Sequence, residues 1–283
     1  MSDEKLNGTA AAPAGADGEP TPIIFLDDIR VTFKTRTGSI LHPNKVQAVR
    51  GLTLKLMPGQ TLGIVGCGKS TTANVMCGLQ QPTSGRVFFK GKDVTKRTAA
   101  ERRLIGRVIS VVFQDPATAL NARMSVHDQL MDPLVVHKIG DKASREARVQ
   151  ELIEMVGLPG SVLDALPGQL SGGQRQRVAI ARALSLKPDA IIADEPTSAL
   201  DVSVRAQILN LLMDLKRDLG LSMVFISHDI QTVRYISDRI IVMNAGVAVE
   251  NGTAEEVFSN PKDEYTKLLL GAAPSLLHPE LGK

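Results

Sequence analysis

The chain contains no tryptophan, and aromatic residues make up only 3% of its 283 residues. Aliphatic side chains must therefore build most of the core, which suits an α/β architecture with buried parallel strands rich in Val, Ile and Leu. There are also only two cysteines, Cys67 and Cys77, so the sequence offers no disulfide framework and indicates a reducing compartment. The simplest interpretation of both cysteines is a small buried residue.

No uninterrupted apolar run approaches the ~20 residues that a membrane-spanning helix needs. A positively charged N-terminal segment followed by an apolar one, typical of a secretory signal, is also missing. The formal net charge is +3, from 33 basic and 30 acidic residues, and this mild excess does not argue for nucleic-acid binding. We therefore expect a soluble chain that meets a membrane only through partner subunits.

The domain organisation can be read from changes in composition. Residues 1–22 have almost no large apolar side chains and predict a disordered tail, whereas residues 23–274 predict one globular unit. Alternating segments between Ile23 and Met57 predict antiparallel strands, joined by a long polar loop from Thr35 to Lys45. Residues 117–170 read as mainly helical and predict a helical subdomain.

The second half of the chain alternates between helices and strands. Apolar strands at 190–193 and 223–226 bracket a helix that ends at Gly220, which predicts a parallel crossover. The predicted fold class is α/β: a nucleotide-binding core sheet flanked by helices, with an antiparallel β subdomain and an α-helical subdomain.

Five short segments with nucleotide-binding character follow one another along the chain. They are GCGKST from Gly66, Gln114 after the strand VVF, LSGGQRQR from Leu170, IIADEPTSALD at 191–201, and ISHD ending at Asp229. One such motif often arises by chance, but five in this order do not. Together they resemble the ATP-binding cassette (ABC) family of transporter ATPases, from about Phe25 to about Pro274.

Lys69 and Ser70 lie where a glycine loop leads into a helix, and backbone N–H groups favour phosphate oxygens at such a place. The resemblance implies that Lys69 contacts the β and γ phosphates of ATP and that Ser70 binds Mg²⁺. It also implies that Phe33 stacks on adenine, with Phe25 as the alternative. The other predicted ATP-binding residues are Gly66, Cys67, Gly68 and Thr71.

The glycine loop is about three residues shorter than the family pattern, because Cys67 alone separates Gly66 from Gly68. Gly63 would restore the formal spacing, but Ile64 and Val65 would then line the phosphate cradle. We favour a strand TLGIV followed by a shortened loop, which predicts weakened ATP binding. A sequence that has lost three codons is the alternative.

Two carboxylates, Asp194 and Glu195, end an apolar strand at the edge where open α/β sheets bind ligands. Asp194 is expected to hold Mg²⁺, and Glu195 to orient or activate the attacking water. Gln114 follows another strand and can reach the metal and the water, although a buried structural glutamine is the alternative. The resemblance implies that His228 hydrogen-bonds the γ-phosphate.

The segment LSGGQ places Ser171, Gly172, Gly173 and Gln174 before a helix, where they offer unobstructed backbone donors. In the ABC family this surface completes the ATP site of the opposite subunit, and Asp201 lies in the segment that signals across that interface. Two cassettes are therefore expected to meet head to tail, as a homodimer or a heterodimer.

Two further segments narrow the resemblance. FQDPATALNARMSV from Phe113, and NPKDEYTKLLLGAAP in a C-terminal extension at 255–283, are similar to the dipeptide, oligopeptide and nickel importer branch. This implies an ATPase subunit of a bacterial importer, most simply for di- or oligopeptides, peripheral on the cytoplasmic face of the inner membrane. Expected partners are two transmembrane permease subunits, a second ABC ATPase and an extracytoplasmic solute-binding protein. A non-hydrolysing regulatory cassette and a soluble ABC ATPase unconnected with transport remain alternatives.

Overall fold

The computed structural model describes residues 20–39, 42–96, 98–115 and 119–272. All but the last three residues of the predicted tail at 1–22 lie outside these ranges, as do residues 117 and 118 of the predicted helical subdomain. Within the described ranges, no helix is long and apolar enough to cross a bilayer.

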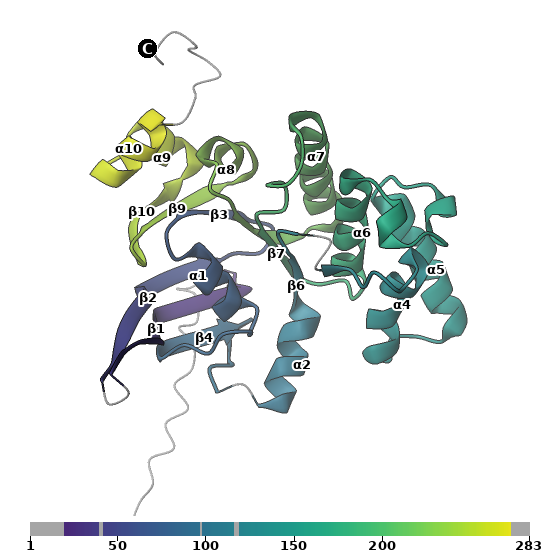
Figure 1. The fold of residues 1–283 in the computed structure, drawn as a ribbon, viewed down its shortest axis with the longest axis horizontal. Coiled ribbons are helices and arrows are strands. Elements are labelled where there is room, and N and C mark those ends of the chain that lie inside the picture. The colour runs from purple at the N-terminus through teal and green to yellow at the C-terminus, as the bar shows by residue number, and fades with distance from the viewer. Residues whose placement is uncertain (1–19, 40–41, 97, 116–118, 273–283) are drawn as a thin grey trace, which may run out of the picture.

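The central sheet has six strands in the order β10-β9-β3-β8-β7-β6 (Figure 1). Neighbours from β9 to β6 pair in parallel, and β10 pairs antiparallel with β9. Their bounds are β3 Thr61–Gly66, β6 Ile109–Val112, β7 Ala190–Asp194, β8 Ser222–Ile226, β9 Arg239–Asn244 and β10 Val247–Thr253.

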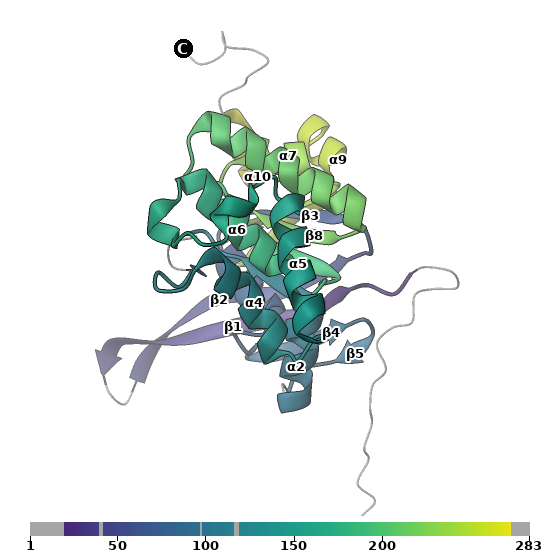
Figure 2. The same ribbon diagram turned by 90° about the vertical axis from the view of Figure 1, so that its right-hand side faces the viewer.

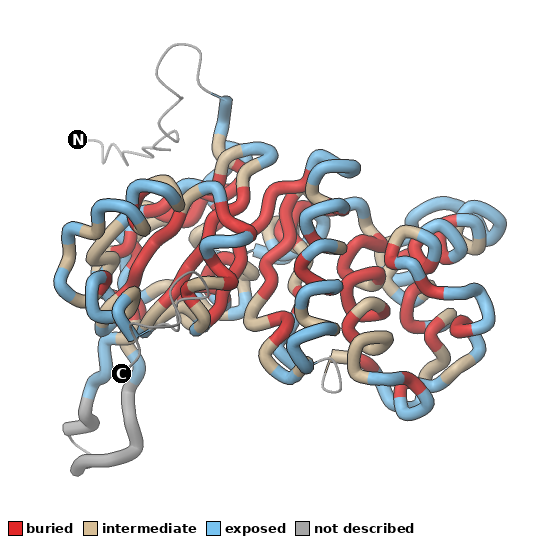
Figure 3. Tube along the Cα trace, turned by 90° about the horizontal axis from the view of Figure 1, so that it is seen from above, coloured by how far each residue is buried: buried red, intermediate tan, exposed pale blue. Residues whose placement is uncertain are grey.

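Alternate residues of β7 enter two different hydrophobic clusters. Ile191 and Ala193 pack with the helices on one face of the sheet, while Ala190 and Ile192 pack with the antiparallel strands on the other. A strand buried on both faces needs an unbroken apolar sequence, which explains the run AIIA. The buried segments in Figure 3 accordingly run through the middle of the molecule and along the inner sides of the helices.

The second sheet is antiparallel, in the order β2-β1-β4-β5. Its bounds are β1 Ile24–Ser39, β2 His42–Leu56, β4 Ser84–Phe89 and β5 Lys92–Asp93. Strands β1 and β2 pair as far as Ser39 and His42, forming a long hairpin that projects from the body (Figure 2). The prediction of a polar loop from Thr35 to Lys45 was therefore wrong. Both strands lack an apolar alternation there, so the hydrophobic pattern carried no signal.

Helices cover the faces of the central sheet. They are α1 Lys69–Met76, α2 Ala99–Val108, α4 Val126–Val136, α5 Lys142–Met155, α6 Gly172–Leu184, α7 Val202–Leu219, α8 Ile230–Ile236, α9 Ala254–Ser259 and α10 Glu264–Ala272, with short 3₁₀ turns at Gly160–Val162 and Pro167–Gln169. Helices α4 and α5 pack on α6, away from the antiparallel sheet (Figure 1).

Helix α7 links β7 to the parallel strand β8, as the sequence predicts. The Asp201 side chain caps its N-terminus by accepting a hydrogen bond from the Val204 N–H at 2.9 Å. Gly220 ends the helix at φ 63°, in the left-handed region that glycine adopts without strain. Local signals at both ends therefore determine its length.

Candidate functional site

The carboxyl ends of four neighbouring parallel strands bring the predicted catalytic residues together. Lys69 follows β3, Gln114 follows β6, Glu195 follows β7 and His228 follows β8. Open α/β sheets bind ligands at this edge. Four residues from four distant parts of the chain thus share one site.

Glu195 is the centre of this cluster. Its carboxylate accepts hydrogen bonds from Lys69 Nζ at 2.9 Å and from Gln114 Nε2 at 3.5 Å, and His228 Nδ1 lies 3.0 Å from it. The Glu195 backbone has φ 47°, a left-handed conformation that is rare for residues other than glycine. Its N–H donates to the Ile226 carbonyl of β8 at 2.8 Å, which holds the carboxylate over the strand ends.

The two neighbouring carboxylates have opposite pKa shifts. Burial alone would raise the pKa of Glu195, but the hydrogen bond and charge of Lys69, together with His228, hold the pKa below its ordinary value. Burial raises the pKa of Asp194, and the nearby charge of Glu195 raises it further, against the opposing effect of Lys69. Glu195 is therefore the carboxylate that stays ionised most readily.

The strand β3 runs through Gly66, so only Cys67 and Gly68 separate it from helix α1. This is the shortened loop that the sequence predicts. Gly63 lies inside β3, where a Cβ atom would be 2.4 Å from both Ser237 Oγ and Val233 Cγ1. Close packing of α8 against the strand explains that glycine, so it need not belong to a phosphate loop.

The short loop leaves few backbone donors for a phosphate. The Cys67 N–H already donates to the Met243 carbonyl at 2.9 Å. Helix α1 has no side-chain cap, so the N–H groups of its first turn, from Lys69, Ser70 and Thr71, face no intrahelical acceptor. An anion at this site would therefore be held by the helix N-terminus and the Lys69 ammonium, rather than by an encircling loop.

Cys67 is exposed, which corrects the expectation of a small buried residue, and Cys77 is half-buried. The C-terminal helix α10 also reaches this loop, which sequence reasoning missed. Burial and the contact with Cys67, including a side-chain hydrogen bond, raise the pKa of the Tyr265 hydroxyl. No periodic signal in the sequence links the two segments, since they are far apart along the chain.

The residues predicted to hold Mg²⁺ are Ser70, Gln114 and Asp194. They offer hydroxyl, amide and carboxylate oxygens, the donors that this hard cation prefers. Across the described ranges, no group of three or more His, Cys, Asp or Glu residues could hold a metal by itself. The donor set fits a cation that keeps water and phosphate oxygens as its other ligands.

The segment LSGGQ lies elsewhere in the fold. Ser171 caps α6: its hydroxyl accepts from the Gln174 N–H at 3.2 Å, and the Gln174 side chain accepts from the Ser171 N–H at 2.9 Å. Gly173 lets α7 approach closely, because a Cβ there would be 2.7 Å from Val204 Cγ1. In Figure 1, α6 and α1 lie on opposite sides of β6 and β7. One chain therefore does not bring Ser171, Gly172 and Gly173 to its own Lys69.

The two phenylalanines considered for the adenine differ in exposure. Phe33, on β1, is 41% exposed. Phe25 is buried and stacks on Phe88, with ring centroids 5.6 Å apart. Phe25 is therefore a core residue, and Phe33 is the one that a ligand can reach.

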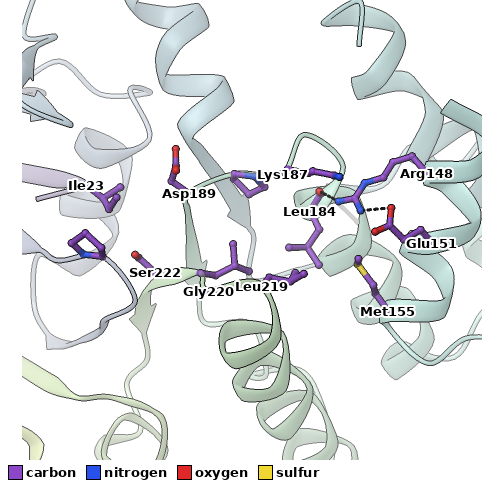
Figure 4. A pocket seen from close by; sticks show the side chains of 13 residues that line it. Ile23, Arg148, Glu151, Met155, Leu184, Lys187, Asp189, Leu219, Gly220 and Ser222 are labelled. Atoms are coloured by element: carbon purple, nitrogen blue, oxygen red, sulfur yellow. Dashed lines mark hydrogen bonds and ion pairs between the residues drawn. The ribbon is translucent and has the colours of Figure 1, made fainter. Parts of the chain in front are cut away.

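A separate cavity of about 380 Å³ lies at the opposite edge of the central sheet, beside the amino ends of β7 and β8 (Figure 4). Three of its four charged side chains are in ion pairs. Arg148 donates to the Leu184 carbonyl at 2.8 Å and bonds Glu151 at 2.7 Å. Asp189 pairs with Lys90 at 2.6 Å. None of the predicted site residues lines this cavity.

The fold and the site define a class of protein: an α/β nucleotide-binding cassette with its reactive groups at the strand ends. Comparison with known proteins identifies the family. Residues 49–198 match the family described as ABC transporter. The chain is 44% identical to the dipeptide transport ATP-binding protein DppF of Haemophilus influenzae, over 91% of this chain and 80% of that protein. It is also 44% identical to the oligopeptide transport ATP-binding protein OppF of Salmonella typhimurium, over 89% and 78%.

A solved structure agrees with these relatives. The ATP-binding cassette MJ0796, in a dimeric post-hydrolysis state bound to ADP and Pi, is 30% identical and superposes with a TM-score of 0.72, over 82% of this chain and 98% of that one. The chain belongs to the ABC transporter family and is an ATP hydrolase of that family. The predicted α/β class, with its two subdomains, is confirmed.

Proposed function

We propose that this chain is the ATP-hydrolysing subunit of a bacterial importer for dipeptides or oligopeptides. The observation that carries the ATPase part is the Glu195 carboxylate, held by Lys69, Gln114 and His228 at one sheet edge. The peptide part is supported by the relatives DppF and OppF, which are named for dipeptide and oligopeptide transport. No observation favours a regulatory cassette or an ATPase unconnected with transport.

Lys69 and Glu195 form an ion pair whose side chains are only 15% and 16% exposed. The γ-phosphate of ATP would take Lys69 from Glu195, leaving the carboxylate with His228 and Gln114. A carboxylate with a lowered pKa is a weak base, so Glu195 would mainly orient the attacking water by accepting its hydrogen bond. His228 would then contact the γ-phosphate, as its exposed ring permits.

Mg²⁺ would be held by Ser70, Asp194 and Gln114, together with phosphate oxygens and water. When bound, it would neutralise charge on the β and γ phosphates. The raised pKa of Asp194 fits a carboxylate that is placed for a cation. The protein groups around it position the phosphate and the water.

A second cassette would complete the site. Ser171, Gly172, Gly173 and Gln174 lie away from Lys69 in the same chain, which supports a head-to-tail dimer with two nucleotides between the subunits. Asp201, at the exposed N-terminus of α7, would transmit the state of one site to the other. The partner would be an identical or a similar ATPase.

Two permease subunits would dock beside Gln114. Phe113 is 44% exposed and borders a small cavity of about 160 Å³ between β6 and helices α4 and α6. An exposed aromatic ring next to a catalytic residue suits a protein contact. The assembly would lie on the cytoplasmic face of the inner membrane and receive solute from an extracytoplasmic binding protein. We also propose the domain bounds: an ABC ATPase domain at 23–274, a helical subdomain at about 117–170 within it, and an importer-type C-terminal extension at 255–283.

Reconstitution of the chain with its permease subunits, second ATPase and binding protein tests the proposal. We expect Mg²⁺-dependent ATP hydrolysis that rises when a di- or oligopeptide is added. Hydrolysis that persists in the complex but ignores peptides of every length tested would contradict the substrate assignment. Nucleotide binding without hydrolysis would contradict the enzymatic one.

A further inference from the structure

The mild positive charge of the chain is concentrated in one segment. No Asp or Glu occurs between Asp28 and Asp93, a stretch that holds ten of the 33 Lys and Arg residues. All 30 acidic residues therefore lie outside it. The stretch includes β2 and β4 and most of β1, so the antiparallel sheet is basic and the rest of the molecule is acidic. Such asymmetry orients a molecule in an external field.

A groove in this basic region has the chemistry of an anion site. It encloses about 500 Å³ and is lined by Thr32, Lys45, Gln47, Arg50 and Thr83, without a carboxylate. The Thr32 N–H donates to the Thr83 hydroxyl at 2.9 Å, which fixes the turn before β4 against β1. None of the predicted ATP-binding residues lines the groove. Phe33 is the neighbour of Thr32 on β1, but successive side chains of a strand point to opposite faces, so the groove and Phe33 lie on different sides of the sheet.

The two cations of the groove have no counter-charge of their own. In the part of the chain that the structure describes, no carboxylate lies within ion-pair distance of Lys45 or Arg50. Arg30, by contrast, is paired with Asp28 at 3.0 Å. Lys45 and Arg50 are both exposed and therefore free to meet an external anion.

We propose that this groove binds the phosphate of an anionic phospholipid headgroup. The hairpin projects from the body (Figure 2), below α9 and α10 in the view of Figure 1. The positive charge of this sheet complements an anionic bilayer surface, which attracts basic side chains. The choice of a bilayer as the phosphate source rests on the proposed importer function. It departs from the expectation that membrane contact runs only through partner subunits.

The test is partition of the purified full chain onto vesicles. Phosphatidylcholine vesicles with added phosphatidylglycerol are compared with pure phosphatidylcholine, at increasing NaCl. The variants are Lys45→Gln/Arg50→Gln and a matched control, Lys142→Gln/Arg123→Gln, which neutralises an exposed lysine and an exposed arginine of the helical region. Unchanged thermal midpoints and ATP affinities exclude misfolding in either variant.

We expect binding to the anionic vesicles only, weakening as salt screens the charges. Each basic side chain near an anionic surface contributes about fivefold, so Lys45→Gln/Arg50→Gln should lower partition by about 30-fold. The control should fall much less. Vesicle binding is measured without ATP or permease. A lack of vesicle binding would therefore leave the ATPase and peptide assignments untouched, and a failure of those assignments would leave vesicle binding intact.

Three results would overturn the proposal. The first is equal binding to both kinds of vesicle, or equal binding by Lys45→Gln/Arg50→Gln and the wild type. The second is displacement by inorganic phosphate where NaCl of the same ionic strength has no effect, which would assign the groove to free phosphate. The third is single-stranded RNA binding that is tighter than vesicle binding and is lost in the same variant.

Discussion

Replacing Glu195 by Gln should tighten ATP binding while it stops hydrolysis. The Glu195 carboxylate holds Lys69 at 2.9 Å, and neither side chain is more than 16% exposed. ATP must break this bond before Lys69 can contact phosphate. Glutamine keeps the shape of the side chain but loses the charge that holds the ammonium.

The expected change in ATP affinity follows from the strength of the hydrogen bond between Lys69 and Glu195. A hydrogen bond to a charged group contributes about 1.5–3 kcal/mol, and a neutral amide would keep part of it. Glu195→Gln should therefore favour nucleotide binding by about 1–2 kcal/mol, a fall of about 5- to 30-fold in Kd. Hydrolysis in the assembled complex should drop by about 10²- to 10⁴-fold, because the proposed role of Glu195 is to orient the attacking water.

Calorimetric titration with a non-hydrolysable ATP analogue measures the first effect, at a protein concentration where light scattering shows a monomer. Glu255→Gln is the matched control, since Glu255 is an exposed glutamate of α9 outside the site. Lys69→Ala should weaken binding whether residue 195 is Glu or Gln. Equal or weaker nucleotide binding by Glu195→Gln would refute the competition between carboxylate and phosphate for Lys69.

Three further substitutions test other parts of the structure. Gly63→Ala should destabilise the protein by about 1–3 kcal/mol in denaturant unfolding, because its Cβ would lie 2.4 Å from two side chains on or next to α8. Gly168→Ala is the control and should not destabilise the protein, because there is open space around Gly168. Asp194→Asn should raise the thermal midpoint at neutral pH, because burial raises the pKa of Asp194 and so penalises its charge. The gain should shrink as the pH falls through the raised pKa and vanish below the ordinary value of 3.8, and a gain that persists in stronger acid would contradict this cause. The contact with Glu146 at 2.8 Å raises the pKa of His127, so its stabilisation is present below the ordinary value of 6.5 and is lost as the pH rises through the folded pKa. His127→Gln should thus cost up to about 1 kcal/mol in acid and little in alkaline solution, and a pH-independent cost would exclude the ion pair as its source.

The convergence of Lys69, Gln114, Glu195 and His228 was predictable because each of them follows an apolar strand within three residues. Parallel strands in one sheet end at the same edge, so Lys69, Glu195 and His228 had to converge once the strands were recognised. The pairing of Lys69 with Glu195 could not be predicted. It depends on two side chains that are 126 positions apart and meet only in the folded protein.

Two elements were missed for different reasons. The hairpin of β1 and β2 extends through a polar stretch, because backbone pairing needs no buried face. Helix α2 did carry a local signal: Thr98 and Glu101 form a reciprocal capping box at its start. A serine or threonine followed three residues later by glutamate is recognisable in a sequence, so this helix could have been predicted.

The short loop after β3, formed by Cys67 and Gly68, should still support catalysis at this edge of the sheet. The most direct test is Mg²⁺-dependent ATP binding and hydrolysis by the chain, alone and assembled with its permease subunits. We expect the chain to bind ATP and the complex to hydrolyse it, and Glu195→Gln to abolish that hydrolysis. Failure to bind ATP at millimolar concentration, in a chain whose intact mass matches the printed sequence, would contradict it.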